Sequence, residues 1–332
     1  MNIPLINRSD SMAFLALQGQ PPIFNKNTHP QISLAHVTSV PPFVKDFDAA
    51  LAAHEIFKKQ ALANPDVHHV RVRYDLERKE SLGLIFGMQH TPEHMTWTRM
   101  RKLQYAGVKV MSLAYDGPTE YGDGFLGSNG LTPRGRNLLL WMGSSGIILD
   151  LSHANALTAR DALEFIEREQ LPLRVMASHS GCYSACPHPR NLSDDIIQRL
   201  QERNGYLGVY AITFYLTWKG DAYLEAMAHH ILRALVVGNR SPTFIGIGSD
   251  CPHIGMTMEQ AQANFDRMVE MLKTNGAFGE YFPDRPPEVI TGGAKMFDVL
   301  EHGLYASIRN DALMRGIMGE NFKAFIERSL PR

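Results

Sequence analysis

Eight short apolar runs, each ending in a small or polar residue, recur along this chain and are separated by stretches with helical periodicity. The runs cover residues 11–17, 32–40, 82–88, 108–115, 147–153, 173–179, 206–212 and 244–250. The helical stretches cover residues 44–62, 93–105, 133–142, 158–168, 193–203 and 222–235. Apolar strands that alternate with helices are typical of a parallel sheet with crossover helices. Eight such units predict an α/β fold of the (β/α)8 TIM-type barrel class.

An open, doubly wound sheet would show the same alternation, so the periodicity favours the barrel without excluding that alternative. The chain lacks a Gly-x-Gly-x-x-Gly motif after its first strand and a Walker-type Gly-Lys-Ser/Thr motif, which argues against the usual nucleotide-binding folds. We therefore expect the chemistry at the carboxyl ends of the strands. Residues 1–332 are predicted to form a single barrel domain, with residues 258–332 as a helical extension packed on it.

The charge balance and the cysteine content narrow the class of protein further. Lys plus Arg number 33 and Asp plus Glu number 34, so no global field favours nucleic acid or an anionic membrane as a partner. No window has the length of apolar sequence that a membrane-spanning helix needs, and no signal peptide is recognisable. Three cysteines, an odd number, fit a reducing compartment. These features predict a cytoplasmic protein that acts on a small molecule.

Three of the expected strands end in side chains that bind metals. His153 and His179 close two consecutive strands, and Asp250 closes a later one. In a barrel these side chains would converge at one end, where two imidazoles and a carboxylate suit zinc or a similar divalent ion. The alternative reading is that both histidines are loop residues hydrogen-bonded to the backbone.

Several motifs of this chain resemble those of the membrane (renal) dipeptidase family, peptidase family M19. The resemblance extends from about residue 82 to residue 325. Its motifs are Gly130-Leu131-Thr132-Pro133-Arg134-Gly135, residues 146–153, Ala177-Ser178-His179-Ser180, residues 189–195, residues 246–250 and Met318-Gly319-Glu320-Asn321-Phe322. It implies a barrel of the metallo-dependent hydrolase kind, a homodimer, and cleavage of dipeptides at a binuclear zinc site.

Carried over by position, the resemblance assigns roles to individual residues. His153 and His179 fall on a zinc-binding pair, and Asp250 falls on an aspartate that acts as ligand and proton acceptor. Arg190 falls on the arginine that holds the substrate carboxylate, a role suited to its planar fork of donors. Three further residues are expected to contact the substrate, namely Tyr115, Gln89 and Asn191.

Other positions depart from the family pattern. The His-x-Asp pair of the first strand is replaced either by Arg8 and Asp10 or by Met12 and Phe14, and we favour the second register because Asp10 then matches an aspartate that precedes the pair. Gln89 stands in place of the bridging glutamate, and Tyr115 in place of a histidine that contacts the substrate. A neutral amide cannot offset the charge of two dications. We therefore predict one zinc ion at most, with no metal as the open alternative.

The leading hypothesis is a divergent dipeptidase-like hydrolase that cleaves an amide bond in a small carboxylate-bearing substrate, such as a dipeptide or an acyl amino acid, with Asp250 as base. The alternatives are a metal-free barrel enzyme with other acid/base chemistry and a noncatalytic homologue that binds a small molecule. His90, Cys182 and Cys251 flank the retained residues. The two cysteines are expected to be buried core residues rather than ligands, and the role of His90 is left open.

Overall fold

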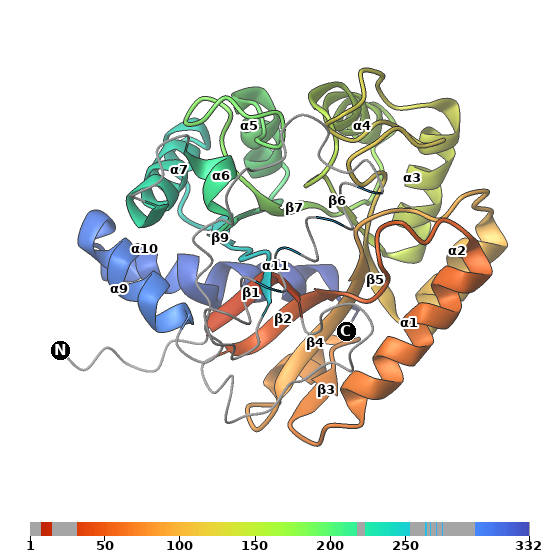
Figure 1. The fold of residues 1–332 in the computed structure, drawn as a ribbon, viewed down its shortest axis with the longest axis horizontal. Coiled ribbons are helices and arrows are strands. Elements are labelled where there is room, and N and C mark those ends of the chain that lie inside the picture. The colour runs from red at the N-terminus through yellow and green to blue at the C-terminus, as the bar shows by residue number, and fades with distance from the viewer. Residues whose placement is uncertain are drawn as a thin grey trace.

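The computed structural model describes residues 8–14, 32–217, 223–252 and 296–331, together with four isolated positions at 263, 266, 270 and 274. Its centre is a parallel sheet that curls into a barrel (Figure 1). The barrel strands are β1 (Arg8–Phe14), β2 (Ile32–Thr38), β4 (Leu82–Met88), β5 (Val108–Ser112), β6 (Ile148–Asp150), β7 (Val175–Ser180), β8 (Tyr206–Val209), β9 (Ile245–Ile247) and β10 (Cys251–Pro252).

The last strand of the barrel is divided into two short segments, and together they close the sheet. β9 pairs with β8, and β10, which follows it after three residues, pairs with β1 through Ala13 and Cys251. The backbone N–H of Asp250, between the two segments, donates to the carbonyl of Met12 at 3.0 Å. All eight expected strands are present in chain order, and the predicted (β/α)8 barrel is confirmed.

The helices that connect the strands surround the barrel (Figure 1). They are α1 (Phe47–Leu62), α2 (Trp97–Ala106), α3 (Pro133–Ser145), α4 (Ala156–Arg168), α5 (Asp194–Glu202), α6 (Thr213–Leu216) and α7 (Tyr223–Val237). Side chains of Asp46, Thr96, Thr132 and Asn155 accept the backbone N–H three residues later and so fix four of the helix starts. None of the described helices combines the length and the apolar character needed to cross a membrane.

Several short elements of the structure were not predicted from the sequence, including β10 and a 3-10 helix at Arg73–Glu77. β3 (Val67–His69) pairs with the start of β4, and α6 is a single turn after β8. Elements of three or four residues are too short to show a period of 2.0 or 3.6 residues. Five expected strands also end early, because the residues that follow them belong to loops; they end at Thr38, Ser112, Asp150, Val209 and Ile247.

The carboxyl-terminal helices pack against the barrel at the amino ends of the strands. They are α9 (Met296–Ile308), α10 (Asp311–Arg315), a π-helical turn (Gly316–Glu320) and α11 (Asn321–Ser329). Arg8 of β1 forms an ion pair with Asp298 of α9 at 2.9 Å, and the Asn321 amide donates to the carbonyl of Ile245 at 2.8 Å. Residue 258, where we expected this extension to begin, lies outside the described residues.

Alternate residues of the strands face the helices and the barrel interior. The helix-facing residues, such as Leu84, Phe86 and Leu149, belong to the main hydrophobic core. At the amino ends the interior residues form a separate apolar cluster with α11. Its members are Leu34, Val70, Ile85, Val110, Ile148, Met176, Tyr206, Phe322, Phe325, Ile326 and Leu330. α11 therefore closes the lower end of the barrel.

One layer higher, the interior is bridged by a hydrogen bond between strands that are not neighbours. The Ser11 hydroxyl of β1 donates to the carbonyl of Ser178 in β7 at 2.7 Å. The strands between them carry Gly208 and Gly248 at this level, and a Cβ atom on either glycine would lie 2.1 or 1.8 Å from that carbonyl oxygen. Two glycines thus allow the barrel wall to approach the Ser11–Ser178 bridge.

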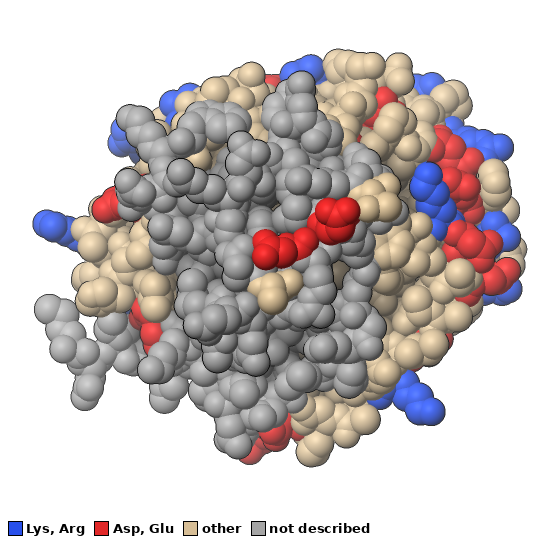
Figure 2. All heavy atoms as spheres, in the orientation of Figure 1, with Lys and Arg blue, Asp and Glu red and all other residues tan. Residues whose placement is uncertain are grey.

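Charged side chains on the surface are mixed in sign. On the face shown in Figure 2, acidic and basic residues lie next to each other along the edge formed by α1, α2 and α3. The described residues on this face therefore form no patch of a single sign, in keeping with the nearly equal numbers of acidic and basic residues in the chain.

Candidate active site

His153 and His179 come together at the carboxyl ends of β6 and β7. His153 follows β6 by three residues and His179 lies within β7, and both side chains are buried. Their Nε2 atoms are 3.0 Å apart, and the ring centroids are separated by 4.9 Å. The structure therefore places both expected imidazoles in one buried site.

The other ring nitrogen of each histidine is held by an oxygen. Nδ1 of His153 lies 2.8 Å from Oδ1 of Asp116, and Nδ1 of His179 lies 2.7 Å from the hydroxyl of Ser178. The Ser178 hydroxyl donates its own proton to Asp150, so it accepts from His179. In the neutral rings both Nδ1 atoms thus carry hydrogen, and the two Nε2 lone pairs face each other.

The electrostatic surroundings keep both rings neutral. Burial holds the pKa of His153 well below its usual range, and the Arg190 guanidinium adds to this effect. Burial also lowers the pKa of His179, with further contributions from His153, Arg190 and His36. Two neutral nitrogens with lone pairs pointing at a common point are suited to hold a cation between them.

Arg190 lies beside this pair, in the loop after β7. Its side chain is only 2% exposed, and its Nη2 atom is 3.3 Å from Nε2 of His153. Its Nη1 atom donates to the carbonyl of Ser152, while its Nε–H has no partner among the described residues. None of the ion pairs formed within those residues includes this guanidinium. Three aromatic rings surround it within 6.0 Å, those of Phe125, Tyr210 and Tyr215.

Asp250 stands at the end of β9 in an unusual backbone conformation. Its φ of 55° lies in the left-handed region, which is strained for an aspartate and common at functional sites. Burial raises its pKa to about 7; Arg190 opposes the rise, and the neighbouring carboxylates of Asp10, Asp116 and Asp150 add to it. A carboxylate with a pKa near neutrality can both accept and release a proton under physiological conditions.

Gln89 and Tyr115 contact the histidine pair from two further strands. The Gln89 amide nitrogen is 3.5 Å from Nε2 of His179, and the Tyr115 ring stacks on His153 with centroids 4.1 Å apart. Both side chains are therefore placed where a ligand of the pair would meet them.

Asn191 has a different environment. Its amide nitrogen donates to the carbonyls of Cys186 and Tyr215, each at 2.8 Å, and its oxygen accepts from the Tyr210 hydroxyl. All of its hydrogen-bonding groups thus hold the loop that carries Arg190 against its neighbours. The substrate contact expected for Asn191 stays a prediction.

The flanking residues point away from the pair or fall outside the description. His90 donates from Nε2 to the carbonyl of Val44 at 2.6 Å, and burial lowers its pKa to about 4. Cys182 is buried, and burial raises the pKa of its thiol to about 12. Both residues therefore have the environment of structural residues. The backbone of Cys251 pairs with β1, but its side chain lies outside the described residues.

The first strand distinguishes the two registers considered above. Arg8 lies at the amino end of β1 and binds residues of α9, including Glu301, far from the carboxyl ends of the strands. Asp10 accepts the backbone N–H of Ser249 at 2.8 Å. Met12 is buried and its carbonyl meets the N–H of Asp250. Met12 is therefore the residue of this strand at the level of the site; the side chain of Phe14 lies outside the described residues.

Metal-binding groups are limited in this structure. No three His, Cys, Asp or Glu side chains lie close enough together to hold a metal ion, as far as the described residues extend. The expected trio is thus represented by the two imidazoles, with Asp250 nearby but not grouped with them.

Asp116 is the residue of the site that sequence reasoning missed. Its signal was its position directly after the expected strand 108–115, where a polar residue belongs to the carboxyl end of the barrel.

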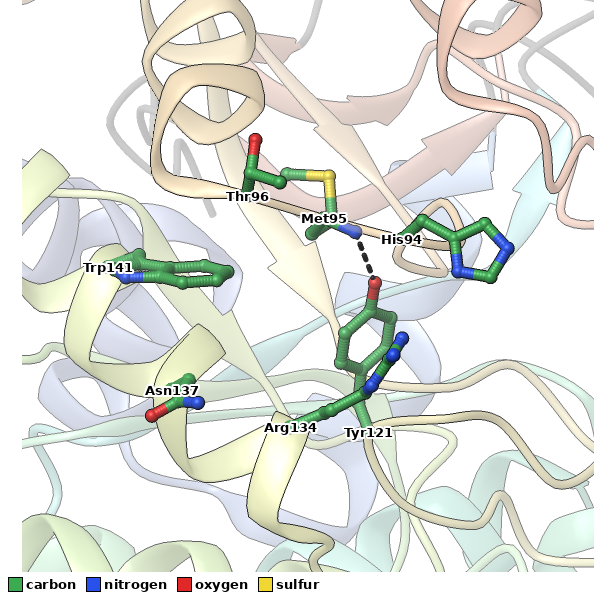
Figure 3. A pocket seen from close by; sticks show the side chains of 7 residues that line it. All are labelled: His94, Met95, Thr96, Tyr121, Arg134, Asn137 and Trp141. Carbon is green, nitrogen blue, oxygen red and sulfur yellow. Dashed lines mark hydrogen bonds between the residues drawn. The ribbon is translucent and has the colours of Figure 1, made fainter.

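A separate pocket of about 300 Å³ lies between the start of α2 and α3 (Figure 3). The Tyr121 hydroxyl at its floor accepts the N–H of Met95 at 2.9 Å. Its other lining residues are His94, Thr96, Arg134, Asn137 and Trp141. The pocket contains none of the expected site residues, so we assign the chemistry to the histidine pair.

The fold is a parallel (β/α)8 barrel of the TIM type with two histidines at the carboxyl ends of adjacent strands. The chain belongs to the membrane dipeptidase family, peptidase family M19, whose family model matches residues 21–278. The resemblance read from the motifs is confirmed.

Curated relatives named dipeptidases match this chain over part of their length. The chain is 33% identical over 165 residues to dipeptidase verJ of Clonostachys rogersoniana, a match that covers 48% of this chain and 40% of the relative. It is 30% identical over 190 residues to dipeptidase aclJ of Aspergillus oryzae, covering 56% and 43% of the two chains. The matched regions thus span less than half of these relatives.

Solved structures share the fold over nearly the whole chain. An amidohydrolase from Pseudomonas aeruginosa superposes with a TM-score of 0.78 at 19% identity, covering 98% of this chain and 96% of that one. A metallopeptidase from Rhodobacter sphaeroides, solved with a phosphinate mimic of L-Ala-D-Ala, gives a TM-score of 0.73 at 17% identity, covering 98% and 100%. At these identities the likeness establishes the fold alone.

Proposed function

We propose that this chain hydrolyses an amide or peptide bond in a small substrate with a free carboxylate, such as a dipeptide or an acyl amino acid. The observation that carries the proposal is the buried Arg190, which forms none of the ion pairs among the described residues and lies 3.3 Å from His153. A buried guanidinium without a carboxylate partner is costly unless an anion binds it. A substrate carboxylate supplies that anion next to the imidazoles.

Asp250 is the proposed general base. Its pKa of about 7 matches the task of taking a proton from water and returning it to the leaving amine. The N–H groups of the Arg190 guanidinium donate to the substrate carboxylate and orient it. Tyr115 and Gln89, both in contact with the histidine pair, border the space in which the scissile bond would lie.

The histidine pair is proposed to hold one zinc ion at most; Asp250 is the third ligand that the resemblance implies, although the described residues do not group it with the pair. Two facing Nε2 lone pairs, each fixed by a hydrogen bond at Nδ1, support a single cation. A second ion has less support, because a neutral amide at Gln89 and the thioether of Met12 stand where the resemblance implies charged or imidazole ligands. A bound zinc ion would supply Lewis acidity toward the carbonyl oxygen.

A second candidate function is metal-free acid/base chemistry at the same site. The neutral Gln89 amide, 3.5 Å from His179, favours it, since this amide donates a hydrogen bond without any metal. In that case Asp250 and Tyr115 would exchange protons with a substrate still held by Arg190.

The test is a hydrolysis assay over dipeptides and acyl amino acids, with and without added zinc, on protein analysed for metal content. We expect turnover of at least one class, and a loss of two or more orders of magnitude in kcat/KM for Arg190→Ala. Amidated substrates, which lack the free carboxylate, should be cleaved poorly by the wild type and be little affected by that change. Absence of turnover under every condition would refute the hydrolase, and a metal-free but active protein would favour the second candidate.

We also propose a homodimer, which the family resemblance implies. Light scattering on the purified chain tests it: a mass near 37.2 kDa would contradict the proposal, and twice that mass would support it.

A further inference from the structure

Asp116 and His153 form a buried carboxylate–imidazole contact. Asp116 follows the end of β5 by four residues, and His153 follows the end of the next strand, β6. Both side chains are 2% exposed, and the Oδ1–Nδ1 distance is 2.8 Å. The contact therefore joins two neighbouring loops above the barrel and is shielded from solvent, where a charged hydrogen bond keeps most of its strength.

This contact selects one tautomer of His153. An ionised carboxylate only accepts hydrogen bonds, so the neutral ring must carry its hydrogen on Nδ1. Nε2 is then an unprotonated nitrogen, and it faces both the Nη2–H of Arg190 at 3.3 Å and Nε2 of His179 at 3.0 Å. The opposite tautomer would aim an N–H at the Arg190 donor and would leave the Asp116 carboxylate facing a lone pair.

The two histidines have different partners at Nδ1. The Nδ1–H of His179 donates to the neutral hydroxyl of Ser178, which accepts because its own proton goes to Asp150. His153 instead donates directly to the carboxylate of Asp116, which can only accept. The Tyr115 ring, stacked on His153 at 4.1 Å, limits rotation of the imidazole. Residue 116 is therefore the direct determinant of the His153 tautomer.

We infer that Asp116 is a positioning residue that fixes the Nδ1–H tautomer of His153 and so presents Nε2 to whatever binds between the two imidazoles. The assignment of the tautomer stands on the contact itself, whereas its effect on turnover rests on the proposed function. Through this tautomer Asp116 sets the cation affinity of the pair. Carboxylates in this relation to a metal-binding histidine typically change affinity by about 10- to 100-fold.

The decisive experiment is ¹⁵N–¹H correlation NMR of histidine-labelled, chelator-treated protein at pH 8, with the His153 signals assigned by their loss in His153→Gln. In the wild type we expect the His153 proton on Nδ1. In Asp116→Asn, whose amide can donate to Nδ1, we expect the Nε2–H tautomer to become populated. An Nε2–H tautomer in the wild type, or an unchanged tautomer in the variant, would overturn the inference.

Asp123→Asn is the matched control. Asp123 is a buried carboxylate in the same connection between β5 and α3, but it accepts from Asn129, at 2.8 Å from the backbone N–H and 3.0 Å from the amide nitrogen. Its variant should leave the His153 tautomer unchanged. If Asp116→Asn does not fold, the wild-type spectrum decides alone, because Nδ1–H supports the inference and Nε2–H refutes it.

Zinc affinity gives a second readout that is independent of turnover. In competition with a chromogenic chelator, Asp116→Asn should bind zinc about 10- to 100-fold more weakly than the wild type, and Asp123→Asn should match the wild type. Equal zinc affinity in Asp116→Asn and the wild type would overturn the effect on affinity. If no substrate is hydrolysed while the tautomer changes as expected, the proposed function fails and the positioning role holds.

Discussion

The lower and upper halves of the barrel interior are built by the same strands, yet their chemistry is opposite. At the amino ends the interior side chains include Ile85, Ile148 and Met176, packed against α11. Two residues further along the same strands stand Gly87, Asp150 and Ser178. Because side chains of a strand alternate between faces, a step of two residues keeps the interior face and changes only its height. The apolar side chains of the interior thus lie in the lower half of the barrel, and the polar side chains lie in the upper half.

Several buried polar groups of the upper half form hydrogen bonds with one another. Asp150 accepts from the hydroxyl of Ser152 at 2.6 Å and from the backbone N–H of Ser178 at 2.9 Å. Buried polar groups that lack such partners cost free energy. Substitutions should therefore lower the unfolding free energy of the two halves for different reasons. In the lower half they leave cavities, and in the upper half they remove hydrogen bonds or cause steric overlap.

The largest effect should come from Gly248→Ala, in the upper half. Its Cβ atom would lie 1.8 Å from the backbone oxygen of Ser178, which cannot move without disrupting the Ser11–Ser178 bridge. We expect a loss of more than about 4 kcal/mol in unfolding free energy, or no folded protein. Gly117→Ala is the control, because no atom lies within 4 Å of its Cβ position. Similar melting temperatures for the two variants would contradict the steric argument.

Phe322→Ala should be the most damaging change in the lower half. Phe322 is fully buried in the cluster that α11 forms with the interior strand residues. Truncation of a buried Phe typically lowers the unfolding free energy by about 3–5 kcal/mol, and urea unfolding of the variant would measure this loss. Phe322→Leu, which refills part of the space, should lose less than half of that. If turnover is measurable, its value per folded molecule should be unchanged, since the site lies at the other end; a large fall would show that the halves are coupled.

Asp10→Ala tests the hydrogen bonds of the upper half. The Asp10 carboxylate accepts the backbone N–H groups of Ser249 and Met12, at 2.8 and 3.1 Å. Removal of the acceptor leaves both buried N–H groups unpaired and should cost about 2–3 kcal/mol in urea unfolding. Asp10→Asn retains one acceptor oxygen and should cost less. An Asp10→Ala protein as stable as the wild type would mean that water replaces the carboxylate.

A smaller, pH-dependent effect is expected from His230, behind the loop that carries Arg190. Burial lowers its pKa from 6.5 to about 4, so the unfolded chain binds the proton first as the pH falls. The contribution of His230 to stability is therefore complete above pH 6.5 and is lost as the pH falls toward 4. Between pH 6.5 and 5 the loss is about 1.5 kcal/mol.

His230→Gln should reduce the slope of unfolding free energy against pH in this range by the share of His230, while the other buried histidines with lowered pKa, such as His69, His90 and His188, keep theirs. The exposed neighbour His229 provides the control, and His229→Gln should leave the slope as it is in the wild type. Identical slopes for the two variants would show that another group carries the pH dependence. The lower interior cluster contains no histidine or carboxylate and should add nothing to this slope.

The strands and helices of the barrel could be predicted because short apolar runs alternate along the chain with stretches of helical periodicity. The sequence also predicted that His153 and His179 close two consecutive strands and therefore lie in one site. The roles of Asp116 and Asn191 could not be predicted, because they depend on how loops after different strands fold onto one another. Asn191, expected to contact the substrate, donates from its side-chain amide to the backbone carbonyls of Cys186 and Tyr215, contacts that the sequence does not reveal.

The bridge from Ser11 to Ser178, with Gly208 and Gly248 drawn close around it, divides the barrel below the histidines. Beneath it, the aromatic rings of α11 fill the remaining space. The described residues thus fill the barrel axis below the histidine pair. For the proposed function, substrate and products would therefore pass on the side of the carboxyl ends of the strands.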